Sequence, residues 1–192
     1  MPKIVDVAGR DRMVSEAAWR VLVRDGLTEL SVRKVASEAG LSPSSLRYTF
    51  PTQASVRDRA VALLVARLTA RVARHGETAE AGLDEARAIL LELLPLDDER
   101  RIEMEVSLAL GALAATDQAL WGAHRRTHLA VRAGCARAVR LLGADHGEVD
   151  GTHAFIDGLA LHLVRQPPDA GDAWAQVALD AYLRRLPRQH DR

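Results

Sequence analysis

Apolar residues recur every three to four positions through most of the chain, and glycines, prolines and a Thr-Asp pair divide this pattern into segments. Such a period is typical of amphipathic helices, and no run alternates apolar and polar residues as a β-strand does. The pattern predicts an all-α fold of about nine helices. Their expected ranges are 8–25, 32–39, 43–49, 53–74, 79–94, 98–115, 117–142, 148–165 and 171–186.

The first predicted helix turns one apolar face inward. Its inward side chains are expected to be Met13, Ala17 and Val21, with Trp19 and Leu22 beside them. Asp25-Gly26 ends this helix, because glycine readily adopts the left-handed conformation that closes many helices. The helix would form a wall for the short helices that follow.

Residues 31–50 hold two short helical patterns on either side of Gly40. Ser31 is suited to cap the first of them. Ser42-Pro43 is a strong start for the second, because the missing N–H of proline costs nothing at the first helical position. Neither helix is long enough to be stable alone. Two short helices joined by a glycine turn are typical of a helix-turn-helix, whose second helix enters the DNA major groove.

The two short helices are expected to share an apolar contact made by Val35, Ala36 and Leu46. The exposed face of the second helix carries hydroxyl groups, a guanidinium and a phenol, which suit base edges and phosphates. These residues are Ser44, Ser45, Arg47, Tyr48 and Thr49.

The stretch at 27–61, LTELSVRKVASEAGLSPSSLRYTFPTQASVRDRAV, resembles the DNA-binding part of the TetR family of dimeric transcriptional regulators. The resemblance covers roughly residues 8–65. Its matching features are Gly26, Ser31-Val32, Val35-Ala36, Ala39-Gly40-Leu41-Ser42, Leu46 and Phe50-Pro51-Thr52. It implies a helix-turn-helix domain over residues 1–53 and a helical ligand-binding and dimerisation domain over residues 54–192. Residues 119–139 and 155–186 resemble, more weakly, the subgroup that includes the betaine-pathway repressors.

The resemblance implies a palindromic double-stranded DNA operator as partner. The expected DNA-binding residues are Arg33, Lys34, Ser42, Ser44, Ser45, Arg47, Tyr48, Thr49, Thr52 and Gln53. The chain departs from the family at Arg47, Thr49 and Gln53, where members often carry tyrosine, histidine or tyrosine, and lysine, respectively. The operator sequence therefore does not carry over. Because Gln53 has no positive charge to offer a phosphate, Arg47 is expected to supply part of that interaction instead.

The resemblance also implies that the two last helices pack against their copies in a homodimer, although the same side chains could pack within one chain. The expected interface residues are Phe155, Leu159, Leu163, Trp174, Val177 and Ala181. A small-molecule inducer would bind an apolar pocket with a few polar groups. The pocket candidates are Met104, Ser107, Leu108, Gly111, Leu120, Trp121, His124, His128, Phe155 and His162. The expected function is a repressor that the inducer releases from DNA.

Two alternatives stay open: an all-helical metal-binding or enzymatic bundle, and a helical interaction module that has lost DNA binding. The first would use His124, His128, His153, His162 and Glu105. His124 and His128 stand four apart, but Arg125 occupies the position where a zinc protease needs glutamate. The motifs GxSxG, GxxxxGK[ST] and GxGxxG are absent from the sequence. We therefore expect no enzyme, no cofactor and no metal.

The zero net charge hides an asymmetry. Residues 1–75 hold 13 Lys and Arg against 7 Asp and Glu, whereas residues 76–192 hold 13 against 19. A basic first part is suited to a polyanion such as DNA. The single Cys135 excludes an intramolecular disulfide and fits a reducing compartment. No apolar run is long enough to span a membrane, so the expected location is the cytoplasm.

Overall fold

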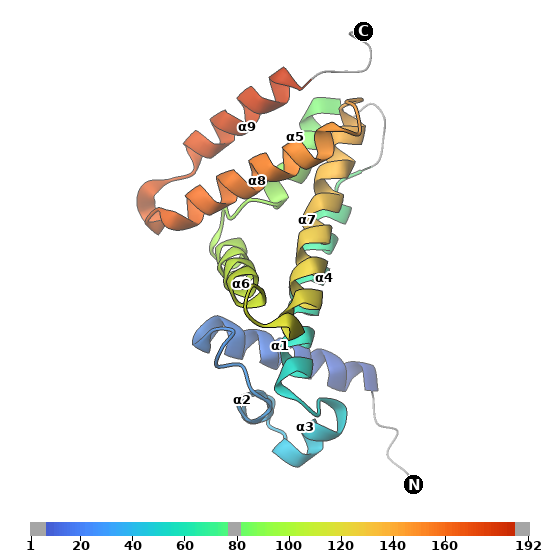
Figure 1. Cartoon of the computed structure of the whole chain (residues 1–192), viewed down its shortest axis with the longest axis vertical. Helices are drawn as coiled ribbons and strands as arrows, with labels where there is room; N and C mark the ends of the chain where they lie inside the picture. Colours follow the sequence, from blue (N-terminus) through green and yellow to red (C-terminus); the bar gives the residue numbers. More distant parts are fainter. Residues whose placement is uncertain (1–6, 77–81, 187–192) are drawn as a thin grey trace. The chain divides into compact units, whose positions relative to one another are not determined.

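The computed structural model describes residues 7–76 and 82–186 of the 192-residue chain (Figure 1). This described part is helical and contains no strand, which confirms the all-α prediction. Its nine α-helices are α1 Val7–Asp25, α2 Val32–Glu38, α3 Pro43–Thr49, α4 Gln53–Ala73, α5 Gly82–Glu92, α6 Asp98–Ala114, α7 Trp121–Leu141, α8 Glu148–Arg165 and α9 Ala173–Arg185. None of the described helices combines the length and the apolar character that crossing a membrane requires.

The predicted helix over 117–142 begins later than expected. The carboxylate of Asp117 accepts a hydrogen bond from the Ala119 N–H at 3.0 Å and caps a 3₁₀ turn, Gln118–Leu120, that precedes α7. A side chain that bonds two residues ahead favours a tight turn over an α-helical start. Helix α5 is also shorter than the predicted 79–94, and residues 79–81 lie outside the described part.

The chain divides into two compact units. Unit 1 comprises residues 1–65 and 108–124, and unit 2 comprises residues 66–107 and 125–192. Helices α4, α6 and α7 each contribute residues to both units. The functional division at residue 53 stays a prediction.

In unit 1, α1 contacts α2 and α2 contacts α3. Val35, Ala36 and Leu46 are fully buried, as expected for the contact between the two short helices. The inward position predicted for Met13 is wrong, because its side chain is 40% exposed. Ala17, Trp19, Val21 and Leu22 are buried as predicted, and Val14 and Ala18 complete the buried face of α1.

The turn between α2 and α3 closes as the sequence predicts. Gly40 has φ +65°, a conformation that is strained for any residue with a Cβ. The Leu41 N–H reaches back to the Ala36 carbonyl at 2.9 Å, which satisfies an unpaired group at the end of α2. Ser31 and Ser42 cap α2 and α3, accepting hydrogen bonds from the N–H groups of Lys34 and Ser45.

In unit 2, helices α5, α7, α8 and α9 contribute side chains to one apolar core that includes Ile89, Leu90, Ile156 and Leu179. Cys135 is buried in this core, and burial raises the pKa of its thiol to about 12. A thiol of this kind is chemically inert at neutral pH.

Three arginines of unit 2 hold the C-terminal ends of other helices by donating to main-chain carbonyls. Arg100 donates to the Leu91 carbonyl at the end of α5. Arg101 caps the end of α8, and Arg137 caps the end of α4. The carbonyls that these two bind belong to Leu163, Val164 and Gln166 for Arg101, and to Val72, His75 and Gly76 for Arg137. Each guanidinium adds donors to carbonyls of a helix end, where the regular α-helical hydrogen bonds stop, although the Leu91, Val72 and Leu163 carbonyls also accept from a nearby main-chain N–H.

Candidate functional site

Helix α3 presents a polar face to solvent and buries the opposite face. Ser44, Arg47, Tyr48 and Thr49 are exposed, and the Tyr48 side chain is 95% exposed. Leu46 is buried and fixes the helix to its unit. A phenol in full contact with water contributes nothing to a core, so these side chains are available to a partner.

Arg10 of α1 also holds α3 in place. One nitrogen, Nη2, donates to the Ser45 carbonyl at 3.1 Å and to the Ser45 hydroxyl at 2.7 Å. Sequence reasoning missed Arg10 because the contact joins residues 35 positions apart, and no local sequence motif predicts it. The only signal was the basic character of the first part of the chain.

The start of α4 is tied to the connection between α1 and α2. The Gln53 side-chain amide donates to the carbonyls of Leu30 at 2.9 Å and Thr28 at 3.4 Å, and Arg57 donates to the Thr28 carbonyl at 3.1 Å. Thr52 forms the exposed N-terminal cap of α4, because its hydroxyl accepts from the Ser55 N–H at 3.1 Å. The structure therefore gives Gln53 a structural contact in addition to its predicted role at DNA.

The two cations predicted on α2 have different surroundings. Lys34 lies 3.1 Å from a carboxylate oxygen of Asp25 and 3.0 Å from one of Glu29. Arg33 is exposed and forms no ion pair or hydrogen bond among the described residues. The same holds for Arg47 on α3 and Arg12 on α1. None of these three guanidinium groups is neutralised by another described side chain.

The ten DNA-binding candidates belong to unit 1 and fall on three elements. Six lie on α3 or its N-cap, two lie on α2, and two lie where α4 begins. In that order they are Ser42, Ser44, Ser45, Arg47, Tyr48 and Thr49; Arg33 and Lys34; and Thr52 and Gln53. The fold of unit 1 thus brings the α3 group onto one short helix, as predicted.

Five of the ligand candidates, Leu108, Gly111, Leu120, Trp121 and His124, lie in unit 1. The Trp121 and His124 rings meet edge to face with centroids 6.0 Å apart. A Cβ at Gly111 would come within 3.3 Å of the His124 ring, so this glycine allows a close approach. Leu120 is buried, and Leu108 is exposed.

The other five candidates, Met104, Ser107, His128, Phe155 and His162, lie in unit 2. Phe155 stacks on Tyr182 with centroids 4.1 Å apart. His128 packs on His153 at 4.6 Å, and His162 meets Trp174 edge to face at 6.5 Å. Unit 2 contains cavities of about 190 and 430 Å³, and none of the ten candidates lines either of them. The inducer pocket therefore stays a prediction.

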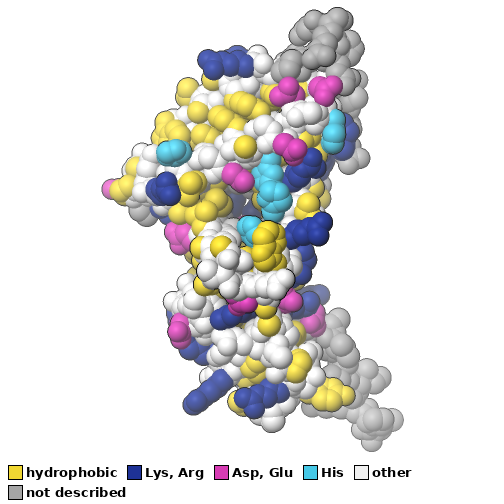
Figure 2. Space-filling model, viewed as in Figure 1, with side chains coloured by type: hydrophobic (Ala, Val, Ile, Leu, Met, Phe, Trp, Pro, Cys, Tyr) yellow, Lys and Arg dark blue, Asp and Glu magenta, His cyan; other side chains and the backbone are white. Residues whose placement is uncertain are grey.

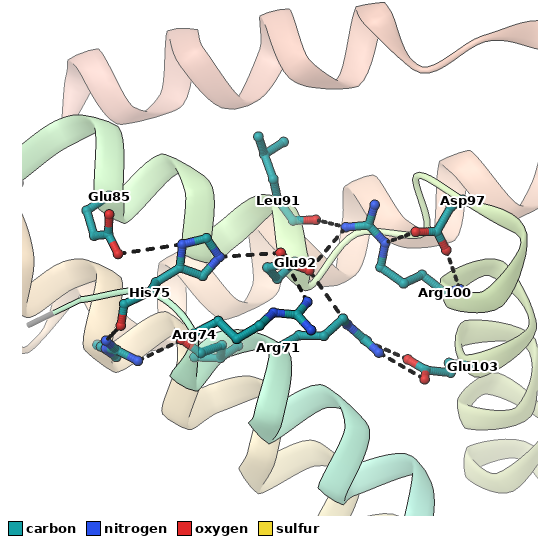
Figure 3. Close-up of polar contacts among 11 residues, drawn as sticks. Arg71, Arg74, His75, Glu85, Leu91, Glu92, Asp97, Arg100 and Glu103 are labelled. Atoms are coloured by element: carbon teal, nitrogen blue, oxygen red, sulfur yellow. Dashed lines mark hydrogen bonds and ion pairs between the residues drawn. The ribbon is translucent and has the colours of Figure 1, made fainter.

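Glu92 lies at the centre of a polar network that joins α4, α5 and α6 within unit 2 (Figure 3). Three guanidinium groups lie 3.5–3.9 Å from its carboxylate, and the His75 Nε2 lies at 3.3 Å. The guanidinium groups belong to Arg71, Arg74 and Arg100. The cavity of about 430 Å³ opens beside this network.

Arg71 forms the most buried ion pair of this network. It donates to both carboxylate oxygens of Glu103, at 3.0 and 2.5 Å. The side chains of Arg71 and Glu103 are only 14% and 7% exposed. Such a bidentate pair is specific to arginine, because only a guanidinium offers two parallel N–H donors.

The histidines do not form a metal centre in the described part of the chain. His153 is buried beside His128, and its Nε2 lies 3.5 Å from a carboxylate oxygen of Asp157. Burial lowers the pKa of the His153 imidazole below its ordinary value of 6.5. Within residues 7–76 and 82–186, no group of three or more His, Cys, Asp or Glu has a geometry suited to a metal ion.

The interface candidates divide by exposure. Leu159 and Leu163 are buried in the core of their own chain, whereas Val177 is 65% exposed and Trp174 is partly exposed. Phe155 and Ala181 are half-buried. Figure 2 shows apolar side chains gathered on the surface over α8 and α9. A partner could cover Val177 and Trp174, while Leu159 and Leu163 would support that surface from beneath.

Comparison with known proteins agrees with these features. Residues 82–188 match the family described as BetI-type transcriptional repressor, C-terminal. The HTH-type transcriptional regulator PksA of Bacillus subtilis (strain 168) is 32% identical over 176 residues, which cover 87% of this chain and 84% of PksA.

Two solved structures are similar over nearly the whole chain. A transcriptional regulator from Rhodococcus sp. Rha1 has a TM-score of 0.73 and 29% identity, covering 92% of this chain and 95% of its own. The multidrug binding protein EbrR complexed with proflavin has a TM-score of 0.61 and 26% identity, covering 90% of this chain and 98% of its own.

Proposed function

Because the chain belongs to the TetR family of transcriptional regulators, we propose that it acts as a homodimeric repressor of a palindromic operator, released from DNA by a small-molecule inducer. The observation that carries this proposal is the polar face of α3, exposed on a helix whose other face is buried. Members of this family are regulators, and we propose no catalytic activity for this chain.

In this proposal α3 is the recognition helix that contacts the DNA bases. Arg47 offers a fork of N–H donors that can bind a guanine edge or a phosphate, and Tyr48, Ser44 and Thr49 offer further hydrogen-bonding groups. Arg33 and the N-terminal cap of α4 at Thr52 supply phosphate contacts. Since one recognition helix reads one half-site, two copies are needed to read a palindrome.

In this proposal α8 and α9 form the dimer interface, and their exposed apolar side chains include Val177 and Trp174. Exposed apolar surface of this kind favours burial against a partner. The similar protein EbrR binds proflavin, which supports a small organic molecule as inducer. In this proposal the inducer binds within residues 54–192 and, through α4, changes the separation of the two recognition helices. A ligand that prefers the released conformation about 100-fold supplies about 2.7 kcal/mol for this change.

The test is selection of bound duplexes from a random DNA library, with wild type and Arg47→Ala in parallel. Arg140→Ala is the matched control, because Arg140 is exposed on α7, outside the proposed DNA-binding and dimerisation helices, and forms no ion pair among the described residues. We expect wild type and the control to recover one palindrome, and Arg47→Ala to lose it. Weak, sequence-independent binding by the wild type at physiological salt would refute the proposal.

A further inference from the structure

The contact between Arg10 and Ser45 carries an inference that rests on the proposed function and deepens it. One guanidinium nitrogen of Arg10 donates to two acceptors of a single residue of α3, the Ser45 carbonyl and the Ser45 hydroxyl oxygen. We propose that Arg10 is a positioning residue that makes Ser45 a hydrogen-bond donor to a base edge of the operator.

The chemistry of the two groups fixes the direction of this hydrogen bond. Arginine remains protonated and has no acceptor, so at 2.7 Å the Ser45 oxygen accepts and the guanidinium donates. A hydroxyl has one hydrogen and two lone pairs, and Arg10 occupies one lone pair. Among the described residues the Ser45 hydroxyl makes no other hydrogen bond, so its hydrogen is available.

The positive charge of Arg10 strengthens this donor. A cation that binds the oxygen polarises the O–H bond and weakens the remaining lone pair as an acceptor. Ser45 should therefore prefer a base that presents an acceptor in the major groove, such as the N7 of a purine or the O4 of thymine. Cytosine presents an amino donor there, so at a G·C pair Ser45 should contact the guanine and not the cytosine.

Arg12 provides a matched comparison on the same helix. It is exposed and has no partner among the described residues, so Arg12→Met removes the same charge from α1 without touching Ser45. A general electrostatic effect of α1 on DNA binding would appear in both variants. An effect transmitted through Ser45 would appear only when Arg10 is changed.

The experiment measures base preference at every operator position for wild type, Arg10→Met, Ser45→Ala, the double variant and Arg12→Met, using duplexes selected by the wild type. We expect Arg10→Met and Ser45→Ala to lose, about tenfold, the same preference at one base pair of each half-site. The double variant should be no worse than Ser45→Ala alone, because Arg10 acts through Ser45. Arg12→Met should keep the wild-type preferences.

Several outcomes would overturn the inference. Unchanged base preferences in Arg10→Met or in Ser45→Ala would do so. Circular dichroism establishes that each variant is folded, and Arg10→Gln replaces Arg10→Met if the methionine variant is not. If the wild type itself selects no sequence, the proposed function fails. If it selects a palindrome that Arg10→Met reads unchanged, only this inference fails.

Discussion

Arg47 on α3 and Arg71 on α4 carry the same charge in opposite surroundings. Arg47 is exposed and has no partner among the described residues, whereas Arg71 is nearly buried and forms ion pairs with Glu103 and Glu92. A count of basic residues treats the two alike. What distinguishes an arginine that supports the fold from one that remains free for a ligand is therefore its carboxylate partners and not its charge.

The largest expected effect comes from replacing the buried arginine, Arg71. Arg71→Met leaves the Glu103 carboxylate buried without its partner, so the free energy of unfolding should fall by about 3–5 kcal/mol. Arg74→Met is the matched control, because Arg74 directly follows the same helix but is largely exposed, 3.9 Å from Glu92. Urea denaturation measures both variants, and equal losses in the two would contradict the structural role given to Arg71.

The substitution Arg47→Ala removes the exposed arginine of this pair. Affinity for the selected operator should fall about 100-fold, because each half-site loses an interaction worth roughly 1–3 kcal/mol. The melting temperature should stay unchanged, because the side chain supports no other described residue. Arg47→Lys keeps the charge but loses the planar fork, so we expect it to recover affinity only in part. Fluorescence anisotropy measures the affinities, and full recovery with lysine would limit Arg47 to a phosphate contact.

A smaller effect separates the neighbours Arg33 and Lys34. Arg33 has no described partner, so Arg33→Ala should reduce the slope of log affinity against log salt by about 2 per dimer. Lys34 is already neutralised by Asp25 and Glu29, so Lys34→Ala should change the slope much less. Titrations at a series of salt concentrations measure both slopes. Equal changes would mean that DNA displaces those carboxylates.

The smallest effect concerns pH. Burial lowers the pKa of His153 in the folded state, so the unfolded state binds more protons as pH falls through about 6.5. The melting temperature should therefore fall by a few degrees between pH 7.5 and 5.5. The charged neighbours are His128 and Arg132, which oppose protonation, and Asp150 and Asp157, which favour it. His153→Asn should flatten this dependence, whereas His146→Asn, at an exposed position, should leave it as in the wild type.

Much of the fold was predictable where local chemistry decides the structure. Ser42-Pro43 starts α3 at the expected residue, and the range predicted for α8 is the one observed. The family prediction, which rested on several fixed spacings around Gly40, is confirmed by the comparisons. The prediction for Met13 failed because a helical period does not fix the margin of an apolar face: Met13 is exposed, whereas the next residue, Val14, is buried.

The candidate site was predictable only where exposure follows from helical phase. Arg47, Tyr48 and Thr49 are exposed as expected, because Leu46 fixes the buried side of α3. The structural contact of Gln53 was not predictable from the sequence. Its acceptors are main-chain carbonyls more than 20 positions away, and every residue type carries such a carbonyl. The role of Arg10 was hidden for the same reason.

The arginine caps of unit 2 have a consequence for how this protein can change. Arg101 and Arg137 recognise carbonyl oxygens, which every amino acid carries, so the side chains of the capped turns need not be kept for the sake of these contacts. Substitutions there can accumulate while the ends of α4 and α8 stay anchored. Such anchoring would let these turns diverge by ordinary mutation without loss of the regulator's architecture.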